Sequence, residues 1–334
     1  MATNRGFGVL AVLSTVLVAA VAGCVADTAS SGPSPVAKGR PAPSASIAPA
    51  AVGANELGVV PILMYHQLSA DPAGEYDQTP AKFRAELDRL YREGYRPVTV
   101  ADYVAGTIDV PAGMHPVVLT FDDSTNSQLA FTPEGGLVPD TAVAILQEFA
   151  TAHPDFRPRA TFYVNNESFG NAPGALKWLV DHGYEVGSHT ATHPNLAQLD
   201  NAGVQREFAD NVRAIETATT SKVHTMALPL GIYPAERALA VEGAADGAAY
   251  RFDAVLLVGA EPAPSPYGAL DRMGIPRIRS GQTDVAFAST YWLDRLAADP
   301  AERYTSDGDP NKISFPSGRA TELAPAWAGR ANPY

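Results

Sequence analysis

The chain has 334 residues, and 46% of them are hydrophobic, which is enough to bury a large core and excludes a mostly disordered protein. The formal net charge of −12, from 24 basic and 36 acidic residues, excludes general nucleic-acid binding, which needs a positive surface to displace phosphate counterions. Because Cys24 is the single cysteine, an intramolecular disulfide and a zinc cluster built from cysteines are excluded as well.

The first 23 residues have the pattern of an export signal. Arg5 supplies a positive start, two apolar runs follow, and the small residues Val21-Ala22-Gly23 precede Cys24. This ending resembles a bacterial lipobox, in which the cysteine is lipidated and becomes the new N-terminus. We therefore expect a lipoprotein that Cys24 tethers to the external face of the cell membrane. A plain signal peptide and an uncleaved anchor are the alternatives, although the apolar run is short for a membrane span.

Residues 24–56 consist mainly of Ala, Ser, Pro and Gly, which favours a flexible spacer because such a stretch has little large apolar surface to bury. A catalytic domain is expected over residues 57–300. Residues 301–334 show no clear periodicity and predict an irregular tail.

Apolar runs and helical periodicity alternate from residue 59 onward. The predicted strands are 59–65, 116–121, 160–164, 185–187, 222–228 and 253–258, and the predicted helices are 79–94, 140–153, 175–182, 205–217 and 235–245. This order implies a parallel sheet with crossover helices, either doubly wound or closed into a barrel.

Two polar clusters follow predicted strands. Asp122 and Asp123 come directly after one strand, and on their own they are compatible with a simple polar turn. His189 and His193 follow another strand, and a lone histidine pair is often incidental. The carboxyl ends of parallel strands meet at one edge of a sheet, so both clusters should lie together. One carboxylate and two imidazoles are the ligand count of a catalytic zinc, and the second carboxylate stays free to act as a base.

These segments resemble the polysaccharide deacetylases, also called carbohydrate esterase family 4 or NodB-homology domains. The resemblance covers about residues 59–280 and rests on four segments: Pro61-Ile62-Leu63-Met64-Tyr65-His66, Leu119-Thr120-Phe121-Asp122-Asp123, Ala160-Thr161-Phe162-Tyr163-Val164, and Glu185 to Leu196 with the run Ser188-His189-Thr190-Ala191-Thr192-His193-Pro194. It implies a distorted (β/α) barrel of about seven strands. It also implies that Asp123, His189 and His193 bind a divalent metal and that Asp122 is the catalytic base. Zinc suits these ligands, as do cobalt and nickel.

The sequence departs from the family pattern in three places. The family's motif of arginine, any residue, proline, any residue and glycine is replaced by Ala227-Leu228-Pro229-Leu230-Gly231, so the arginine that orients the base is missing. Leu230 still supplies the backbone N–H that the family uses for the oxyanion. No histidine follows His224, although members commonly use a late histidine as general acid, and the family's tryptophan-bearing motif is not recognisable.

Three interpretations of these departures remain open. Asp122 itself can carry its proton to the leaving nitrogen. Alternatively, His66 and Arg277, which both lie at ends of predicted strands, replace the missing groups, with Arg277 orienting Asp122. A structural histidine and a surface ion pair are the simpler explanations of these two residues. In the third interpretation, catalysis is lost and the domain only binds metal or glycan.

The expected function is metal-dependent removal of acetyl groups from an N-acetylated glycan such as peptidoglycan, a chitin-like chain or poly-N-acetylglucosamine. The alternatives are an O-acetyl esterase acting on xylan-like sugars and a non-catalytic surface lipoprotein that binds glycan. The expected partners are an acetylated polysaccharide and, through the lipid on Cys24, the membrane, with no nucleic acid.

Overall fold

The computed structural model describes residues 47–280 and 285–334, which belong to one compact unit. The predicted signal segment 1–23, the lipidation site Cys24 and most of the predicted spacer 24–56 lie outside the described residues. No helix among the described residues is both long and apolar enough to cross a membrane.

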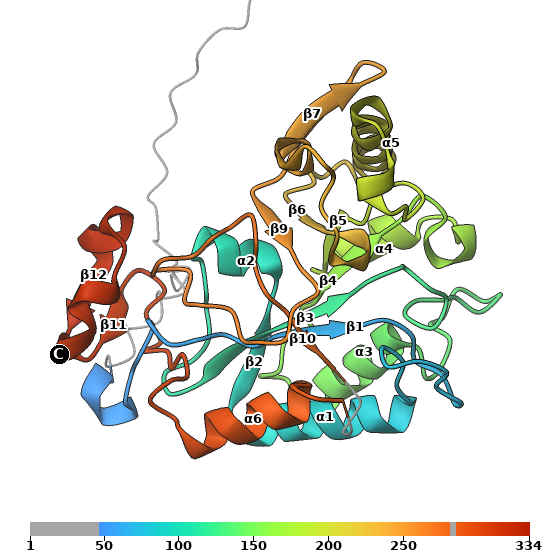
Figure 1. Cartoon of the computed structure of the whole chain (residues 1–334). Coiled ribbons are helices and arrows are strands. Elements are labelled where there is room, and N and C mark those ends of the chain that lie inside the picture. The colour runs from blue at the N-terminus through green and yellow to red at the C-terminus, as the bar shows by residue number, and fades with distance from the viewer. Residues whose placement is uncertain (1–46, 281–284) are drawn as a thin grey trace, which may run out of the picture. The chain divides into compact units, whose positions relative to one another are not determined.

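A sheet of parallel strands forms the centre of this unit (Figure 1). Its strand order within the described residues is β10-β1-β3-β4-β5-β6-β9, and β2 pairs with β3 beside this path. The strands are β1 (Ile62–Tyr65), β2 (Tyr95–Val98), β3 (His115–Phe121), β4 (Thr161–Val164), β5 (Glu185–Ser188), β6 (Thr225–Ala227), β9 (Ala254–Leu256) and β10 (Ile278–Arg279).

One short segment joins the two edges of the sheet. Ile275 pairs with Leu256 of β9, and three residues later Ile278 pairs with Leu63 of β1. The sheet therefore curves round on itself, and the predicted distorted (β/α) barrel is confirmed.

Six helices are described, and they connect or flank the strands. They are α1 (Pro80–Arg92), α2 (Val100–Ala105), α3 (Ala142–Ala152), α4 (Ala175–Asp181), α5 (Asn201–Thr219) and α6 (Ser289–Ala298). α1 begins as its sequence predicts, because the Thr79 side chain accepts a hydrogen bond from the Lys82 N–H and proline occupies the first turn. Short 3₁₀ turns cover Pro49–Val52, Ser168–Asn171, Leu196–Gln198, Pro229–Gly231, Arg237–Ala240, Ser317–Glu322 and Pro325–Arg330.

Alternate residues of the strands enter two different hydrophobic clusters. In β3, Leu119 and Phe121 pack in the cluster that contains α1 and α3, whereas Val118 packs in a second cluster with Tyr163 and Leu256. Both faces of the sheet are thus covered, which explains why the strands are continuous apolar runs rather than alternating ones.

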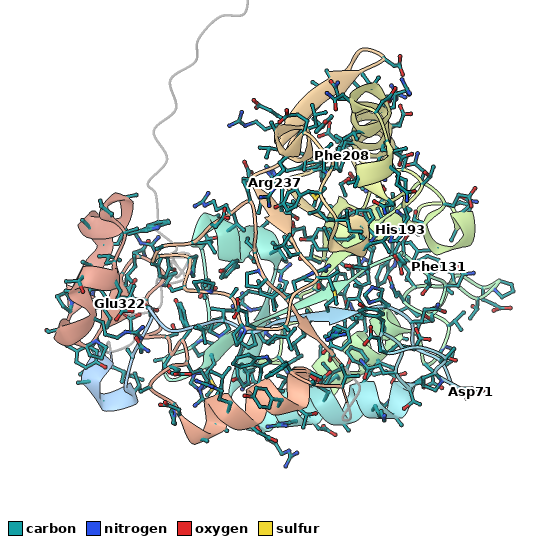
Figure 2. All side chains as sticks on the ribbon, in the orientation of Figure 1. Asp71, Phe131, His193, Phe208, Arg237 and Glu322 are labelled. Atoms are coloured by element: carbon teal, nitrogen blue, oxygen red, sulfur yellow. The ribbon has the colours of Figure 1, made fainter. Side chains whose placement is uncertain are left out.

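The predicted helix over 235–245 is wrong. The structure has a 3₁₀ turn at Arg237–Ala240, followed by an antiparallel hairpin of β7 (Glu242–Ala245) and β8 (Ala248–Arg251). Asp246 and Gly247 form its two-residue turn with φ of 48° and 77°, the conformation that an Asp-Gly pair favours. The hairpin packs on α5, on which Figure 2 labels Phe208. The ring centroids of Tyr250 in the hairpin and Phe208 are 5.2 Å apart.

Both ends of the predicted catalytic domain differ from the structure. Ala54 and Glu56, expected in the spacer, are buried, and Asn55 pairs with Thr305. The expected irregular tail contains β11 (Ile313–Phe315) and β12 (Ala331–Pro333), which pair in parallel. These strands have three residues each, too short for a visible periodicity. Ser314 of β11 bonds to Glu56, 258 residues earlier in the chain.

Glu56 is one of two buried acidic groups, with Asp307, at this junction of chain ends in the described part of the chain. It accepts hydrogen bonds from the Ser314 N–H (2.7 Å) and the Tyr304 hydroxyl (3.1 Å). Burial, and then the nearby Asp307 carboxylate, raise the pKa of Glu56 from 4.5 to about 8. The folded protein therefore holds a proton that the unfolded chain releases, and its free energy of unfolding should fall as the pH rises from about 5 to 8.

We expect Glu56→Gln to reduce this loss of stability, because the amide mimics the protonated carboxyl. A single such group contributes a slope of at most about 1.4 kcal/mol per pH unit. Urea unfolding at pH 5, 6, 7 and 8 measures the free energy of unfolding of the parent and the variant. The parent and the variant should converge at pH 5 and separate at pH 8, with the variant the more stable. Parallel pH curves for the two proteins would contradict this prediction.

Candidate active site

The structure brings Asp123, His189 and His193 together at the carboxyl ends of β3 and β5. Oδ1 of Asp123 lies 3.4 Å from Nε2 of His189 and 3.4 Å from Nε2 of His193. One ligand atom from each of the three residues lies within 4.8 Å of the others. Figure 2 labels His193 on the loop that follows β5. Among the described residues, this is the one group of three or more potential ligands that meets that spacing.

A loop residue after β4, Asn165, connects the two ligand-bearing segments. Its amide Nδ2 donates to the carbonyl oxygens of His189 (2.7 Å) and Thr190 (3.0 Å), and its backbone N–H donates to the Ser124 hydroxyl (3.2 Å). Asp123, Ser124, Thr190 and His193 all have positive φ, between 48° and 71°. Such backbone strain in non-glycine residues clusters at functional sites.

The ligand atoms fit a divalent metal. Asp123 Oδ1 is buried and has no hydrogen-bond partner among the described residues, although it faces two imidazole nitrogens. Nδ1 of His189 lies 2.8 Å from the Ala227 carbonyl oxygen, so the ring donates there and presents Nε2 as a lone pair to a cation. A cation between these three atoms would satisfy the otherwise unpaired carboxylate oxygen.

Charges within the cluster shift its titrations. Burial opposes the charged form of His189, but Asp122 and Asp123 outweigh it and raise the pKa of that imidazole. Burial and the charge of His189 lower the pKa of His193. For Asp123, the contact with His189 outweighs burial and lowers the pKa. Metal binding should therefore release a proton from the site.

Asp122 is buried beside this cluster and forms a two-pronged ion pair with Arg277. Nη1 and Nη2 of Arg277 each lie 2.7 Å from one carboxylate oxygen of Asp122. Burial favours the neutral acid, but Arg277 and then His189 outweigh it and hold the pKa of Asp122 well below its usual range. Oδ2 of Asp122 is 4.0 Å from Nε2 of His189, so the ion-paired carboxylate lies next to the ligand cluster.

Arg277 is itself fixed inside the barrel. Its side chain is 0% exposed, Nε donates to the Leu257 carbonyl (2.9 Å), and Nη1 also reaches the Thr120 hydroxyl (3.2 Å). Ala227, which stands where the family pattern has an arginine, is a buried residue of β6. Here an arginine that directly precedes β10 therefore reaches the carboxylate. The surface ion pair considered for Arg277 is excluded by its burial.

His66 follows β1 at the same edge and is partly exposed. Its ring packs against Tyr76 at a centroid distance of 4.7 Å, and Nδ1 has no hydrogen-bond partner among the described residues. Burial lowers the pKa of His66, while the charges of Asp122 and Asp123 act in the opposite direction.

The sequence interpretation missed Gln128, which links the candidate base to His66. Its amide nitrogen donates to the backbone carbonyls of both His66 (2.8 Å) and Asp122 (2.5 Å), and its side chain is fully buried. Gln128 lies in a loop, so no periodicity marks it in the sequence. Its position six residues after Asp122 is the one sequence feature that could have pointed to it.

Leu230 lies in the 3₁₀ turn after β6, with φ of 58° and a side chain that is 57% exposed. The backbone hydrogen bonds of this turn are donated by Gly231 and Ile232, so the N–H of Leu230 is not used in them.

Comparison with known proteins gives this geometry a context. Residues 109–245 match the family model for polysaccharide deacetylase. This deacetylase-like segment includes Asp122, Asp123, His189 and His193, whereas His66 and Arg277 lie outside it.

Two kinds of curated enzyme are similar in sequence to part of this chain. A chitooligosaccharide deacetylase of Sinorhizobium fredii is 32% identical over 133 residues, which are 40% of this chain and 54% of the relative. A peptidoglycan-N-acetylglucosamine deacetylase of Bacillus cereus is 26% identical over 125 residues, 37% of this chain and 40% of the relative. The alignments thus span about half the length of these relatives, or less.

Solved structures share the fold. A polysaccharide deacetylase from Bacillus cereus superposes with a TM-score of 0.53 at 21% identity, covering 72% of this chain and 68% of that one. A Streptococcus pyogenes deacetylase crystallised with acetate superposes with a TM-score of 0.51 at 19% identity, covering 66% of this chain and 92% of that one.

Proposed function

We propose that this protein is a metal-dependent polysaccharide deacetylase that removes acetyl groups from an N-acetylated glycan. The convergence of Asp123, His189 and His193, with the ion-paired Asp122 beside them, carries the proposal. The matched family and the printed activities of the relatives, on chitooligosaccharides and on peptidoglycan, support this class of substrate.

The three ligand side chains would hold a zinc ion, or a cobalt or nickel ion in its place. When bound, such an ion polarises the acetyl carbonyl and makes a coordinated water more acidic.

Asp122 acts as the base that accepts the proton of the attacking water. Its carboxylate is held at both oxygens by Arg277, and each oxygen keeps a further lone pair for this proton. The water oxygen then bonds to the carbonyl carbon. We assign the hydrogen bond to the developing oxyanion to the N–H of Leu230, which the hydrogen bonds of its own turn do not use.

The C–N bond breaks as the nitrogen receives a proton, so the products are acetate and a free amine. Asp122 can return the proton that it took, and His66 is the second group at this edge that can deliver one. We favour His66, because Gln128 ties its backbone to that of Asp122 and its ring is partly exposed to an incoming substrate.

A single assay tests this function. The purified chain is stripped with a chelator, reloaded with zinc, cobalt or nickel, and incubated with chitohexaose, peptidoglycan fragments or acetylxylan while acetate is measured. We expect metal-dependent release from at least one of the two N-acetylated substrates. Release from acetylxylan alone would identify an O-acetyl esterase, and metal uptake without acetate release would indicate a binding protein.

We also propose that the chain is a lipoprotein on the external face of the cell membrane, anchored at Cys24. The signal-like segment and the small residues before that cysteine support this location. Cys24→Ser should shift the protein from the membrane fraction to the medium and remove labelling by a fatty-acid probe. Unchanged membrane retention of the variant would refute the anchor.

A further inference from the structure

Helix α5 holds the loop that carries the two histidine ligands, and the chemistry above makes no use of this helix. We call residues 189–193 the ligand loop. α5 packs against β5, the strand that leads into the ligand loop. Figure 2 labels Phe208 on α5 and His193 at the end of the loop. Glu207 and Asn211 of α5 lie about one helical turn apart, and both bond to the ligand loop or to the strand ends beside it.

Glu207 binds the ligand loop at three points. Its carboxylate accepts hydrogen bonds from the N–H (2.8 Å) and the hydroxyl (2.7 Å) of Thr192. Its backbone carbonyl accepts a third hydrogen bond from the N–H of Ala191 (3.1 Å). Thr192 directly precedes His193 in the chain. Two hydrogen bonds from one residue to a single carboxylate are strong and directional, so they fix how the peptide before His193 is turned.

Asn211 fixes α5 to the sheet. Its side chain is 0% exposed, and its amide oxygen accepts from the hydroxyl of Ser188 (2.6 Å). Its amide nitrogen donates to the carbonyl of Val164 (3.0 Å) and to the side-chain oxygen of Asn166 (3.0 Å). Ser188 is the last residue of β5 and Val164 the last of β4. The helix that carries Glu207 is therefore tied to the same strand ends from which the site is built.

The second half of the ligand loop depends on Glu207. The backbone carbonyls of the first three loop residues accept hydrogen bonds from Asn165 and Asn166, which follow β4. Within the part of the chain that the structure describes, Glu207 is the one residue outside the loop that hydrogen-bonds to Thr192. The position of the peptide that enters His193 is therefore set from α5.

Of the two histidine ligands, His193 is the less enclosed. The His189 side chain is 2% exposed and its ring is bonded through Nδ1 to a backbone carbonyl, whereas the His193 side chain is 33% exposed. Thr190 and His193 have φ of 64° and 57°, a conformation that non-glycine residues keep only where their surroundings hold it. The two hydrogen bonds from Thr192 to Glu207 supply such a constraint between these two residues.

We propose that Glu207 is a positioning residue for the metal ligand His193. Glu207 is not a ligand itself. It holds the peptide of Thr192 so that Nε2 of His193 lies 3.4 Å from Oδ1 of Asp123 before an ion binds. This inference rests on the proposed function and extends its metal site to a helix that supplies no ligand. Residues that orient metal ligands typically change metal affinity about tenfold to a hundredfold.

The zinc affinity of the full chain, measured by competition with a chromophoric chelator, tests this role without turnover. Glu207→Ala should weaken zinc binding about tenfold, because the freed loop lets His193 move away from the other two ligands. Asp210→Ala is the matched control. Asp210 lies three residues further along α5, and its ion pair is with Arg213 rather than with the ligand loop. This control should bind zinc like the parent.

The visible absorption spectrum of the cobalt-loaded protein separates positioning from a purely structural role. The spectrum reports the geometry of the ligands around cobalt, and a loss of stability alone does not change it in the folded protein. Glu207→Ala should alter the spectrum. Glu207→Gln should restore both the parental spectrum and most of the zinc affinity, because its amide can accept from the Thr192 N–H and donate to the Thr192 hydroxyl.

Parental zinc affinity and a parental cobalt spectrum in Glu207→Ala would overturn the proposal. A Glu207→Gln variant as weak as Glu207→Ala would overturn it too, since the charge and not the hydrogen bonds would then set the affinity. The same holds for an Asp210→Ala variant that loses as much zinc affinity as Glu207→Ala. A parent that binds zinc but releases no acetate would refute the proposed catalysis alone.

Discussion

Asp122→Asn should reduce acetate release at least about a hundredfold, because the base that accepts the water's proton is lost. Asp122 is not one of the three ligand side chains, so the folded variant should still bind zinc with an affinity close to that of the parent. His189→Ala provides the contrast. It removes a ligand and the bond to the Ala227 carbonyl, and it should lose both zinc binding and acetate release.

Two measurements on the same samples check this first prediction: zinc bound per chain after dialysis and the initial rate of acetate release. Circular dichroism confirms that each variant is folded, since Asp122→Asn also leaves Arg277 without its charged partner. A folded Asp122→Asn variant with the parental rate would refute the assignment of Asp122 as the base. A His189→Ala variant that binds zinc as the parent does would refute the ligand set.

Arg277→Met should lower the free energy of unfolding by about 3–5 kcal/mol, because Asp122 then stays buried without its counter-charge. Acetate release should fall with it, since the carboxylate is no longer held at both oxygens. We expect kcat to fall while KM changes little, because Arg277 is fully buried and touches no substrate.

The double variant Asp122→Asn/Arg277→Met removes both charges, so its stability should recover toward that of the parent while activity stays lost. Arg277→Lys keeps the charge without the planar fork and should recover more stability than kcat. Urea unfolding and steady-state kinetics on the parent, the two single variants, the double variant and Arg277→Lys measure these effects. Purely additive losses in the double variant would contradict the direct coupling of the two side chains.

Local sequence patterns predicted most of the barrel's strands and helices, and the prediction failed where two local patterns pointed to different structures. Over residues 235–245 a helical periodicity outweighed the Asp246-Gly247 pair that follows, which is a hairpin turn in the structure. The last part of the chain was predicted to be irregular because β11 and β12 are too short to show a periodicity. Tyr304 and Ile313 in this part are buried by residues that are distant in the sequence.

The convergence of the Asp122-Asp123 pair with the two histidines could be predicted from the sequence because parallel strands constrain where their ends lie, whereas the resemblance to the family implied that Asp123 is the ligand. Asp123 and the two histidines each follow a strand of one parallel sheet, so their loops had to emerge at the same edge. The connection between strand order and loop position is topological, and it does not depend on the details of packing.

The partner of Asp122 was decided by the tertiary structure. The sequence offered Arg277 only as one candidate, 155 residues away from Asp122. Whether its guanidinium turned into the barrel or out to solvent depended on the closure of the sheet by Ile275 and Ile278. The bonds of Gln128 to His66 and Asp122 arose in the same way. Sequence patterns specify which face of an element is buried, whereas the pairing of polar groups inside follows from side-chain directions that exist only once the barrel has closed.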